Sequence, residues 1–173
     1  RVTFQHIGRI SEEELVQRLQ GQQQVLCIVN TKKRAQAVYD RIKGEGVYHL
    51  STAMYPRHRR RILSIVKNRL ETGKPCILIS TSLVEAGVDL DFQSVYRQLA
   101  GIDSMIQAAG RCNREGKRSA EESRMTIFQF QDGESVPGQR QQMDVAKYLL
   151  DQKAPVEALE TVEQYFETLY HLR

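Results

Sequence analysis

The fold is decided by the stretch from Val25 to Leu50, VLCIVNTKKRAQAVYDRIKGEGVYHL. It begins with five apolar residues, VLCIV, a compact run that is typical of a buried strand. Apolar residues then recur at helical spacing from Lys32 to Ile42, and Gly44 and Gly46 end that helix. Val47 to Leu50 is a second short apolar run. The stretch therefore predicts a strand–helix–strand unit.

The same alternation continues toward the C-terminus. Pro56 opens a long helix that closes at Gly73 and Pro75. One face of this helix is expected to carry Ile62, Ile65, Val66 and Leu70. Further strands are predicted at Ile77–Ile79, Val95–Leu99 and Met125–Phe130. Strands that alternate with helices indicate βαβ units with right-handed crossovers, so we expect an α/β fold with a mainly parallel sheet.

Length and composition limit the possible classes of protein. The chain has 173 residues, of which 40% are hydrophobic and 27% charged, and this suits one soluble globular core. It has neither a long apolar run nor a signal-peptide pattern, so we expect no membrane contact. The three cysteines match neither a zinc site nor a disulfide framework, which favours the cytoplasm. A net charge of +4 suits a nucleic-acid partner without requiring one.

Two parts of the chain are expected. Residues 1–133 should form the α/β lobe, and residues 134–173 a helical extension that packs on it or leads into a following domain. Helical patterns at Gln139–Gln152 and Pro155–Leu172 support the second part. Because the chain starts at Arg1 rather than at a methionine, we expect it to be a piece of a longer protein.

Chemically unusual residues follow several predicted strands. In open α/β sheets, ligands bind beyond the carboxyl ends of the strands. This rule points to Asn30–Lys33, Ser51–Met54, Ser80–Asp91 and the residues from Ala100 onward.

Gln107, Arg111 and Arg114 are spaced as one stripe on a helix. Guanidinium groups match phosphate oxygens, and Gly110 allows close approach to the backbone. Taken alone, the stripe fits either a polyphosphate clamp or a solvated helix face.

The stretch from Ser80 to Asp91, STSLVEAGVDLD, directly follows a strand. Its hydroxyl groups can bind phosphate or cap a helix, Gly87 allows a tight turn, and Asp89 can accept a hydrogen bond from a ribose hydroxyl. A capped turn with a surface aspartate fits equally well.

Four stretches in this order resemble motifs IV, IVa, V and VI of superfamily 2 helicases. They are Val25–Lys33, His49–Arg60, Ser80–Asp91 and Gln107–Arg114. The segments Thr81–Phe92, Leu99–Lys117 and His49–Arg60 are most similar to the type I CRISPR-associated helicase-nuclease. DEAD-box enzymes usually have glycine where this chain has Asn113, which counts against that class. The resemblance implies a RecA-like, P-loop-NTPase-type α/β/α sandwich, the second lobe of the motor, with a helical C-terminal tail.

In such motors ATP binds between two lobes. The chain lacks the G-x-x-x-x-G-K-[ST] loop and the D-E-x-[DH] box, so ATP and Mg²⁺ should be held mainly by the first lobe, which is absent here. By resemblance, Arg114 is the arginine finger, with Arg111 beside it. The ATP-binding residues are expected to be Gln107, Gly87, Asp89 and Gly110.

The resemblance also implies contacts to the nucleic-acid backbone. The candidate residues are Asn30, Thr31, Lys32, Ser51, Thr52 and Thr81. The expected partners are single-stranded DNA, the first lobe of the same protein and a CRISPR guide-RNA surveillance complex. The arginines from Arg57 to Arg61 fit a solvated helix face or a nucleic-acid contact, and no metal site is expected at His49 and His58.

The implied function is that of a motor lobe of an ATP-dependent 3′-to-5′ DNA translocase in CRISPR antiviral defence, inactive as an isolated fragment. Two alternatives remain open: the equivalent lobe of another superfamily 2 DNA or RNA helicase, and a catalytically silent RecA-like lobe that only binds nucleic acid.

Overall fold

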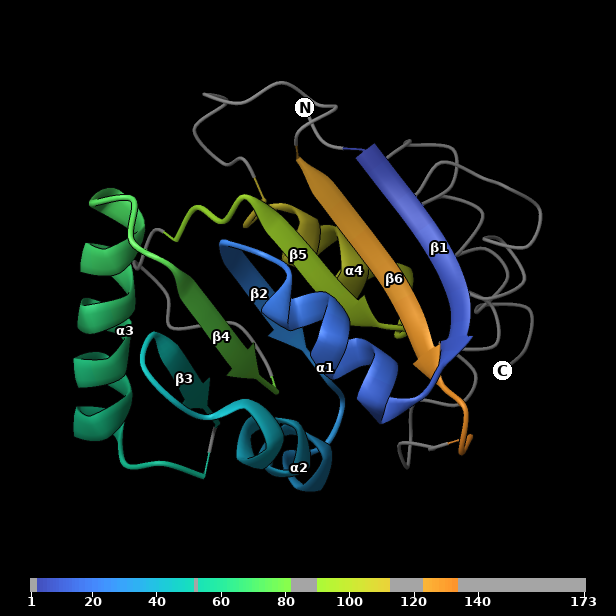
Figure 1. Cartoon of the computed structure of the whole chain (residues 1–173), viewed down its shortest axis with the longest axis horizontal. Helices are drawn as coiled ribbons and strands as arrows, with labels where there is room; N and C mark the ends of the chain where they lie inside the picture. Colours follow the sequence, from blue (N-terminus) through green and yellow to red (C-terminus); the bar gives the residue numbers. More distant parts are fainter. Residues whose placement is uncertain (1–2, 52, 82–89, 113–122, 134–173) are drawn as a thin grey trace.

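Six strands form one sheet in the computed structural model, which describes residues 3–51, 53–81, 90–112 and 123–133 (Figure 1). The strands lie in the order β1-β6-β5-β2-β4-β3, and every pair of neighbours is parallel. The strands are β1 (Thr3–Ile10), β2 (Gln24–Ile28), β3 (Val47–Leu50), β4 (Cys76–Ser80), β5 (Ser94–Gln98) and β6 (Arg124–Phe130). The helices are α1 (Glu12–Gln20), α2 (Lys32–Ile42), α3 (Pro56–Glu71) and α4 (Ile102–Ala109).

Helices cover both faces of the sheet. Helices α1 and α2 bury side chains such as Leu15 and Val38 in one apolar cluster. The same cluster contains the side chains on one face of the central strands. Helices α3 and α4 bury Leu63 and Met105 in a second cluster on the other face. In Figure 1, α1 accordingly lies in front of the sheet and α4 behind it. The expected RecA-like three-layer α/β/α sandwich with a parallel sheet is confirmed; the expected tail, 134–173, lies outside the described residues.

The first two elements, β1 and α1, were missed by the sequence patterns. Strand β1 is the edge strand beside β6, and only Ile10 of its residues is buried, so it lacks the apolar run that marks the central strands. Helix α1 did carry a signal, because Ser11 and Glu14 have the spacing of a capping box. The Ser11 hydroxyl accepts a hydrogen bond of 3.0 Å from the Glu14 backbone N–H.

The buried face of α3 differs from the one expected. Ile65 was assigned to the core face, yet it is 38% exposed, whereas Leu63 is only 3% exposed. The residues of α3 that pack on the core are Ile62, Leu63, Val66 and Leu70, whose spacing places them on one side of the helix. The prediction was right for Ile62, Val66 and Leu70 and wrong for Ile65, because α3 has more apolar residues than one face can hold.

The parallel strands give the sheet two chemically different edges. Leu50 pairs with Ser80, Ile28 pairs with the same Ser80, and Ile28 also pairs with Arg97, so β3, β4, β2 and β5 end level with one another. We name this side the carboxyl edge and the side where these strands begin the amino edge. Because a five-residue strand spans roughly 17 Å, the two edges are separated by about that distance.

Candidate nucleotide and nucleic-acid sites

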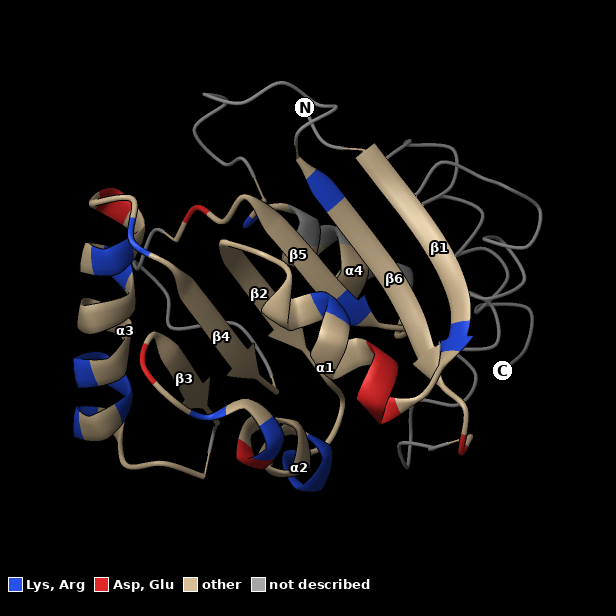
Figure 2. Ribbon diagram, in the orientation of Figure 1, with Lys and Arg blue, Asp and Glu red and all other residues tan. Residues whose placement is uncertain are grey.

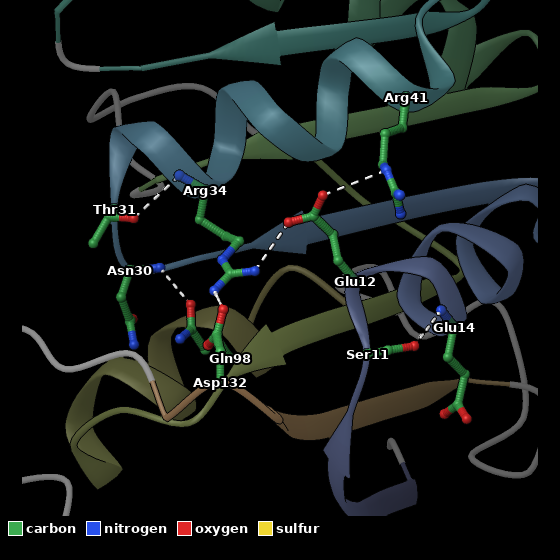
Figure 3. Close-up of polar contacts among 9 residues, drawn as sticks. All are labelled: Ser11, Glu12, Glu14, Asn30, Thr31, Arg34, Arg41, Gln98 and Asp132. Atoms are coloured by element: carbon green, nitrogen blue, oxygen red, sulfur yellow. Dashed lines mark hydrogen bonds and ion pairs between the residues drawn. The ribbon is translucent and has the colours of Figure 1, made fainter.

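Asn30 lies at the carboxyl edge, just after β2, and its polar groups join β2 to β5. Its backbone N–H donates to Oε1 of Gln98 over 2.9 Å (Figure 3), and its side-chain Nδ2 donates to the Leu99 carbonyl over 3.0 Å. Its Oδ1 accepts a hydrogen bond of 2.8 Å from Nη1 of Arg97. Asn30, which is predicted to contact nucleic acid, therefore already holds two strand ends together.

Arg97 is a buried cation that the sequence patterns did not single out. It is only 7% exposed and makes an ion pair with no described carboxylate. Its Nη1 also donates to the Gln98 carbonyl over 3.0 Å. Burial lowers the pKa of the guanidinium to about 10, so it stays charged at neutral pH. The carboxyl edge thus holds a buried positive charge whose hydrogen-bond acceptors among the described residues are neutral oxygens. The signal in the sequence was an arginine inside a predicted strand.

Thr31 and Lys32 begin α2 at the same edge. The Thr31 hydroxyl accepts a hydrogen bond of 3.2 Å from the Arg34 backbone N–H and so caps the helix (Figure 3). Lys32 is exposed, and the first turn of α2 holds no acidic residue. The N-terminal partial charge of the helix and the lysine therefore both favour an anion here.

Ser51 and Thr81 follow the paired residues Leu50 and Ser80 and are neighbours at the carboxyl edge. The Ser51 hydroxyl accepts a hydrogen bond of 3.1 Å from the Ala53 backbone N–H, which fixes the turn before α3. The hydroxyl oxygen of Thr81 is buried and has no hydrogen-bond partner in the described part of the chain. Such groups are rare because an unmade hydrogen bond costs about 1–3 kcal/mol. Thr81 thus carries an unused donor; Thr52 lies outside the described residues.

Arg111 lies at the amino edge, opposite the residues above. Its carbonyl accepts a hydrogen bond of 2.9 Å from the Phe92 N–H, just before β5 begins, and Cys112 forms a bridge with Phe92. Helix α4 starts at the carboxyl edge after β5 and brings the chain back across the sheet. The sequence rule placed Arg111 beyond the carboxyl ends of the strands, whereas the structure places it at the amino edge. The physical reason is that a chain in a parallel sheet must return to the amino edge before each new strand.

The predicted helical stripe of Gln107, Arg111 and Arg114 is also corrected. Helix α4 ends at Ala109, and the backbone N–H of Arg111 closes a final turn on the Ala108 carbonyl over 3.0 Å. Glycine favours such an end, and the pairing with Phe92 stops the helix there. Gln107 and Gly110 are exposed and Arg111 is half-buried. Arg114, Gly87 and Asp89 lie outside the described residues.

Arg34 is a second charged residue that the patterns missed. Its guanidinium binds Glu12 of α1 over 2.9 Å and Asp132, and it stacks over the Phe130 ring at 3.9 Å (Figure 3). Its side chain is 11% exposed. Arg34 therefore ties the start of α2 to α1 and to the end of β6. Its partners are carboxylates of the lobe itself, which makes it a structural residue.

The remaining reactive groups are buried or scattered. Cys27, Cys76 and Cys112 are free and buried, and burial raises the pKa of Cys27 to about 12 and that of Cys76 to about 11. The Cys112 thiol donates to the Gln93 carbonyl over 3.4 Å. Within the described ranges, no group of three His, Cys, Asp or Glu side chains could hold a metal ion. No described helix is long and apolar enough to span a membrane.

A family model decides which proteins this lobe resembles. Residues 21–117, from before β2 to beyond α4, match the family described as CRISPR-associated nuclease/helicase Cas3, C-terminal. The chain belongs to this Cas3 family. The matched span contains both the carboxyl-edge residues and Arg111.

Individual Cas3 proteins agree with this assignment. Cas3 of Haloferax volcanii is 37% identical over 90 residues, which are 51% of this chain and 10% of the relative. A crystal structure of T. fusca Cas3-ATP superposes with a TM-score of 0.74 at 21% identity, over 98% of this chain and 23% of the other. A chain of a CRISPR RNA-guided surveillance complex, pre-nicking, gives 0.72 at 20% identity, over 98% of this chain and 25% of the other. The predicted second RecA-like lobe of a superfamily 2, Cas3-like helicase is confirmed, and it spans about a quarter or less of these relatives.

Proposed function

We propose that this Cas3-family lobe is one half of an ATP-driven motor that moves along single-stranded DNA in the 3′-to-5′ direction. The observation that carries the proposal is the separation of the candidate residues into two groups. The backbone-binding candidates lie at the carboxyl edge, and Arg111 lies at the amino edge. One lobe can then contact ATP on one side and a nucleic-acid strand on the other.

The amino edge would form one wall of the ATP site. Arg111 and Arg114 would neutralise the charge that develops on the transferring γ-phosphoryl group. The pairing of Arg111 with Phe92 supports this role, because it fixes the backbone from which the guanidinium extends. Gln107 would orient the nucleotide or the attacking water. Asp89 would bind the ribose, while Gly87 and Gly110 would leave room for the nucleotide.

The carboxyl edge would grip the DNA backbone. The unused hydroxyl of Thr81 would donate to a phosphate oxygen, and the exposed N-terminus of α2 with Thr31 and Lys32 would bind the next one. Asn30, Ser51 and Thr52 would complete this surface. Contacts of this kind carry no sequence information, so the motor would act on any sequence.

Helix α4 would couple the two edges. It starts beside Leu99, whose carbonyl accepts a hydrogen bond from Asn30, and it ends two residues before Arg111. Eight helical residues span about 12 Å, which covers most of the distance between the edges. A shift of Arg111 when ATP is hydrolysed would therefore be passed along α4 toward the Leu99 carbonyl, to which Asn30 donates. Closure on ATP and opening after hydrolysis would then advance the strand.

The other half of the motor must come from a first RecA-like lobe of the same protein. The chain has no phosphate loop and no acidic D-E-x-[DH] box, so that lobe would hold most of the ATP and the Mg²⁺. Bound Mg²⁺ would shield the phosphate charges there. The isolated chain should consequently hydrolyse essentially no ATP. A guide-RNA surveillance complex is the proposed partner that delivers the DNA, a relation that the similarity to a chain of such a complex supports.

ATP turnover by the full-length protein tests this function. We expect single-stranded DNA to stimulate turnover and single-stranded RNA to leave it near the basal rate. Stimulation by RNA would favour an RNA helicase of another superfamily 2 branch. The absence of turnover with either strand would indicate a lobe that binds nucleic acid without driving a motor.

A further inference from the structure

One aromatic ring stands almost fully in solvent at the carboxyl edge. Tyr55 is 83% exposed, and the other exposed large apolar residue of the described part, Ile65, is 38% exposed. Tyr55 precedes α3 and its side chain makes no capping hydrogen bond. Its ring is therefore free of both the core and the helix end.

The backbone under Tyr55 is fixed although its ring is free. The Met54 N–H donates to the Ser51 carbonyl over 3.1 Å, and Nη1 of Arg59 donates to the Met54 carbonyl over 2.9 Å. Pro56 follows and holds its own φ near that of a helix. Only the two side-chain torsions of Tyr55 remain to be ordered on binding, so immobilising the ring costs little conformational entropy.

The surroundings of Tyr55 are basic. From Ala53 to Leu70 the sequence contains no Asp or Glu, and its basic residues are Arg57, Arg59, Arg60, Arg61, Lys67 and Arg69. Arg57, Arg60 and Arg61 are exposed on the first turns of α3. Figure 2 shows blue, the colour of Lys and Arg, on the lower half of α3, which is its N-terminal half, and again near its upper end. An exposed ring beside several cations matches a nucleic-acid strand, which offers both flat bases and phosphates.

Tyr55 also adjoins the candidate phosphate-binding residues. Ser51 and Thr81 follow the paired residues Leu50 and Ser80, and the Met54–Ser51 hydrogen bond holds the start of α3 against this point. If a phosphate of a DNA strand contacts Thr81, the next bases of that DNA strand would lie beside the Tyr55 ring. The basic residues alone fit a solvated helix face; the exposed ring among them does not.

We propose that Tyr55 is a stacking platform for an unpaired base of the single-stranded DNA that this lobe grips, flanked by phosphate contacts from the first turns of α3. This inference rests on the proposed function and adds a base contact to the backbone contacts described above. Stacking is tolerant of sequence, because every base has a π-face, so Tyr55 holds the register of the strand without selecting its sequence.

The test compares two ligands and three variants in the full-length protein. The ligands are a fluorescent oligothymidylate and an oligomer of the same length made of abasic sites, which keeps the phosphates and lacks the bases. The variants are Tyr55→Ala, Tyr55→Phe, and Ile65→Ala as a control for loss of an exposed apolar side chain on the same helix. Affinity is measured by anisotropy at one salt concentration, because phosphate contacts depend on salt.

We expect Tyr55→Ala to weaken oligothymidylate binding about fivefold or more and to leave binding of the abasic oligomer unchanged. Tyr55→Phe keeps the π-face and should bind as the unaltered protein does, as should Ile65→Ala. Equal binding by Tyr55→Ala and the unaltered protein would overturn the inference. So would an equal loss for both oligomers, or a loss in Tyr55→Phe as large as in Tyr55→Ala. Failure of the unaltered protein to bind either oligomer would instead refute the proposed function.

Discussion

Arg97 and Asn30 are joined by a hydrogen bond of 2.8 Å that links the ends of two neighbouring strands. The guanidinium is buried and the amide oxygen is its side-chain acceptor. The same asparagine supports the carbonyl of Leu99, from which α4 departs. A single amide thus organises the carboxyl edge and the start of the helix that leads to Arg111.

Asn30→Ala should destabilise the chain by about 2–3 kcal/mol, because it leaves the Arg97 guanidinium buried with an unmade hydrogen bond. Urea denaturation measures the change. The control is Gln36→Ala, which removes an exposed side-chain hydrogen bond to Asp40 and should change stability by no more than about 0.5 kcal/mol. Equal stability of the two variants would show that the Arg97 contact contributes little.

Thr81→Val should separate stability from binding. The substitution removes a buried hydroxyl without a partner, so the free energy of unfolding should stay the same or rise slightly. Affinity for single-stranded DNA should fall by roughly tenfold or more, the usual value of a hydrogen bond to a charged group.

Ser51→Ala is the stability control for Thr81→Val, because it removes a neighbouring hydroxyl that does make a hydrogen bond. The Ser51 hydroxyl accepts a hydrogen bond from the Ala53 N–H, so its loss should lower stability by about 1 kcal/mol. Unchanged DNA affinity in Thr81→Val would exclude Thr81 from the phosphate contacts.

Arg114→Ala in the full-length protein should reduce DNA-stimulated ATP turnover by about 100-fold or more, as expected for an arginine finger. Arg41→Ala serves as a control, since Arg41 is half exposed on α2 and its one ion pair within the described ranges is with Glu12 over 3.5 Å. Near-normal turnover of Arg114→Ala, with folding intact, would remove Arg114 from the proposed role.

Gly46→Ala should destabilise the chain by about 1–2 kcal/mol or more. Gly46 has a φ of +80°, and a Cβ there would lie 3.0 Å from the Pro75 carbonyl oxygen. Gly21 is a matched control with a φ of −82° and a nearest neighbour at 3.5 Å, so Gly21→Ala should be neutral or stabilising. Thermal unfolding of both variants checks the contrast, and equal melting temperatures would contradict it.

The central strands and helices were predictable because their apolar residues repeat at the strand and helix periods. Helices α2 and α3 begin and end at the expected residues, and β2, β4 and β5 lie within one residue of their predicted bounds. The edge strand β1 was missed because its largely polar sequence is not buried. Hydrophobic periodicity in a sequence marks the side of a strand or helix that faces the core. An edge strand has few residues on such a side, so its pattern is weak.

The candidate site was only partly predictable from the sequence. Motif order selected Arg111 and Thr81 as candidates. It did not show that one lies at the amino edge and the other at the carboxyl edge, because that follows from the path of α4 across the sheet. Arg97 and Arg34 were missed, since their partners Asn30 and Asp132 are far away along the chain. Contacts of this kind depend on the order of strands, which no local pattern reveals.

Strand β1 limits how far this lobe can be shortened for expression. The family match covers residues 21–117, so a fragment cut to that span would lose β1, α1 and β6. It would leave β5 as a bare edge with unpaired backbone groups and would uncover the apolar surface beneath Leu15 and Leu19. Such a fragment should aggregate when expressed, and any shortened version needs at least residues 3–130.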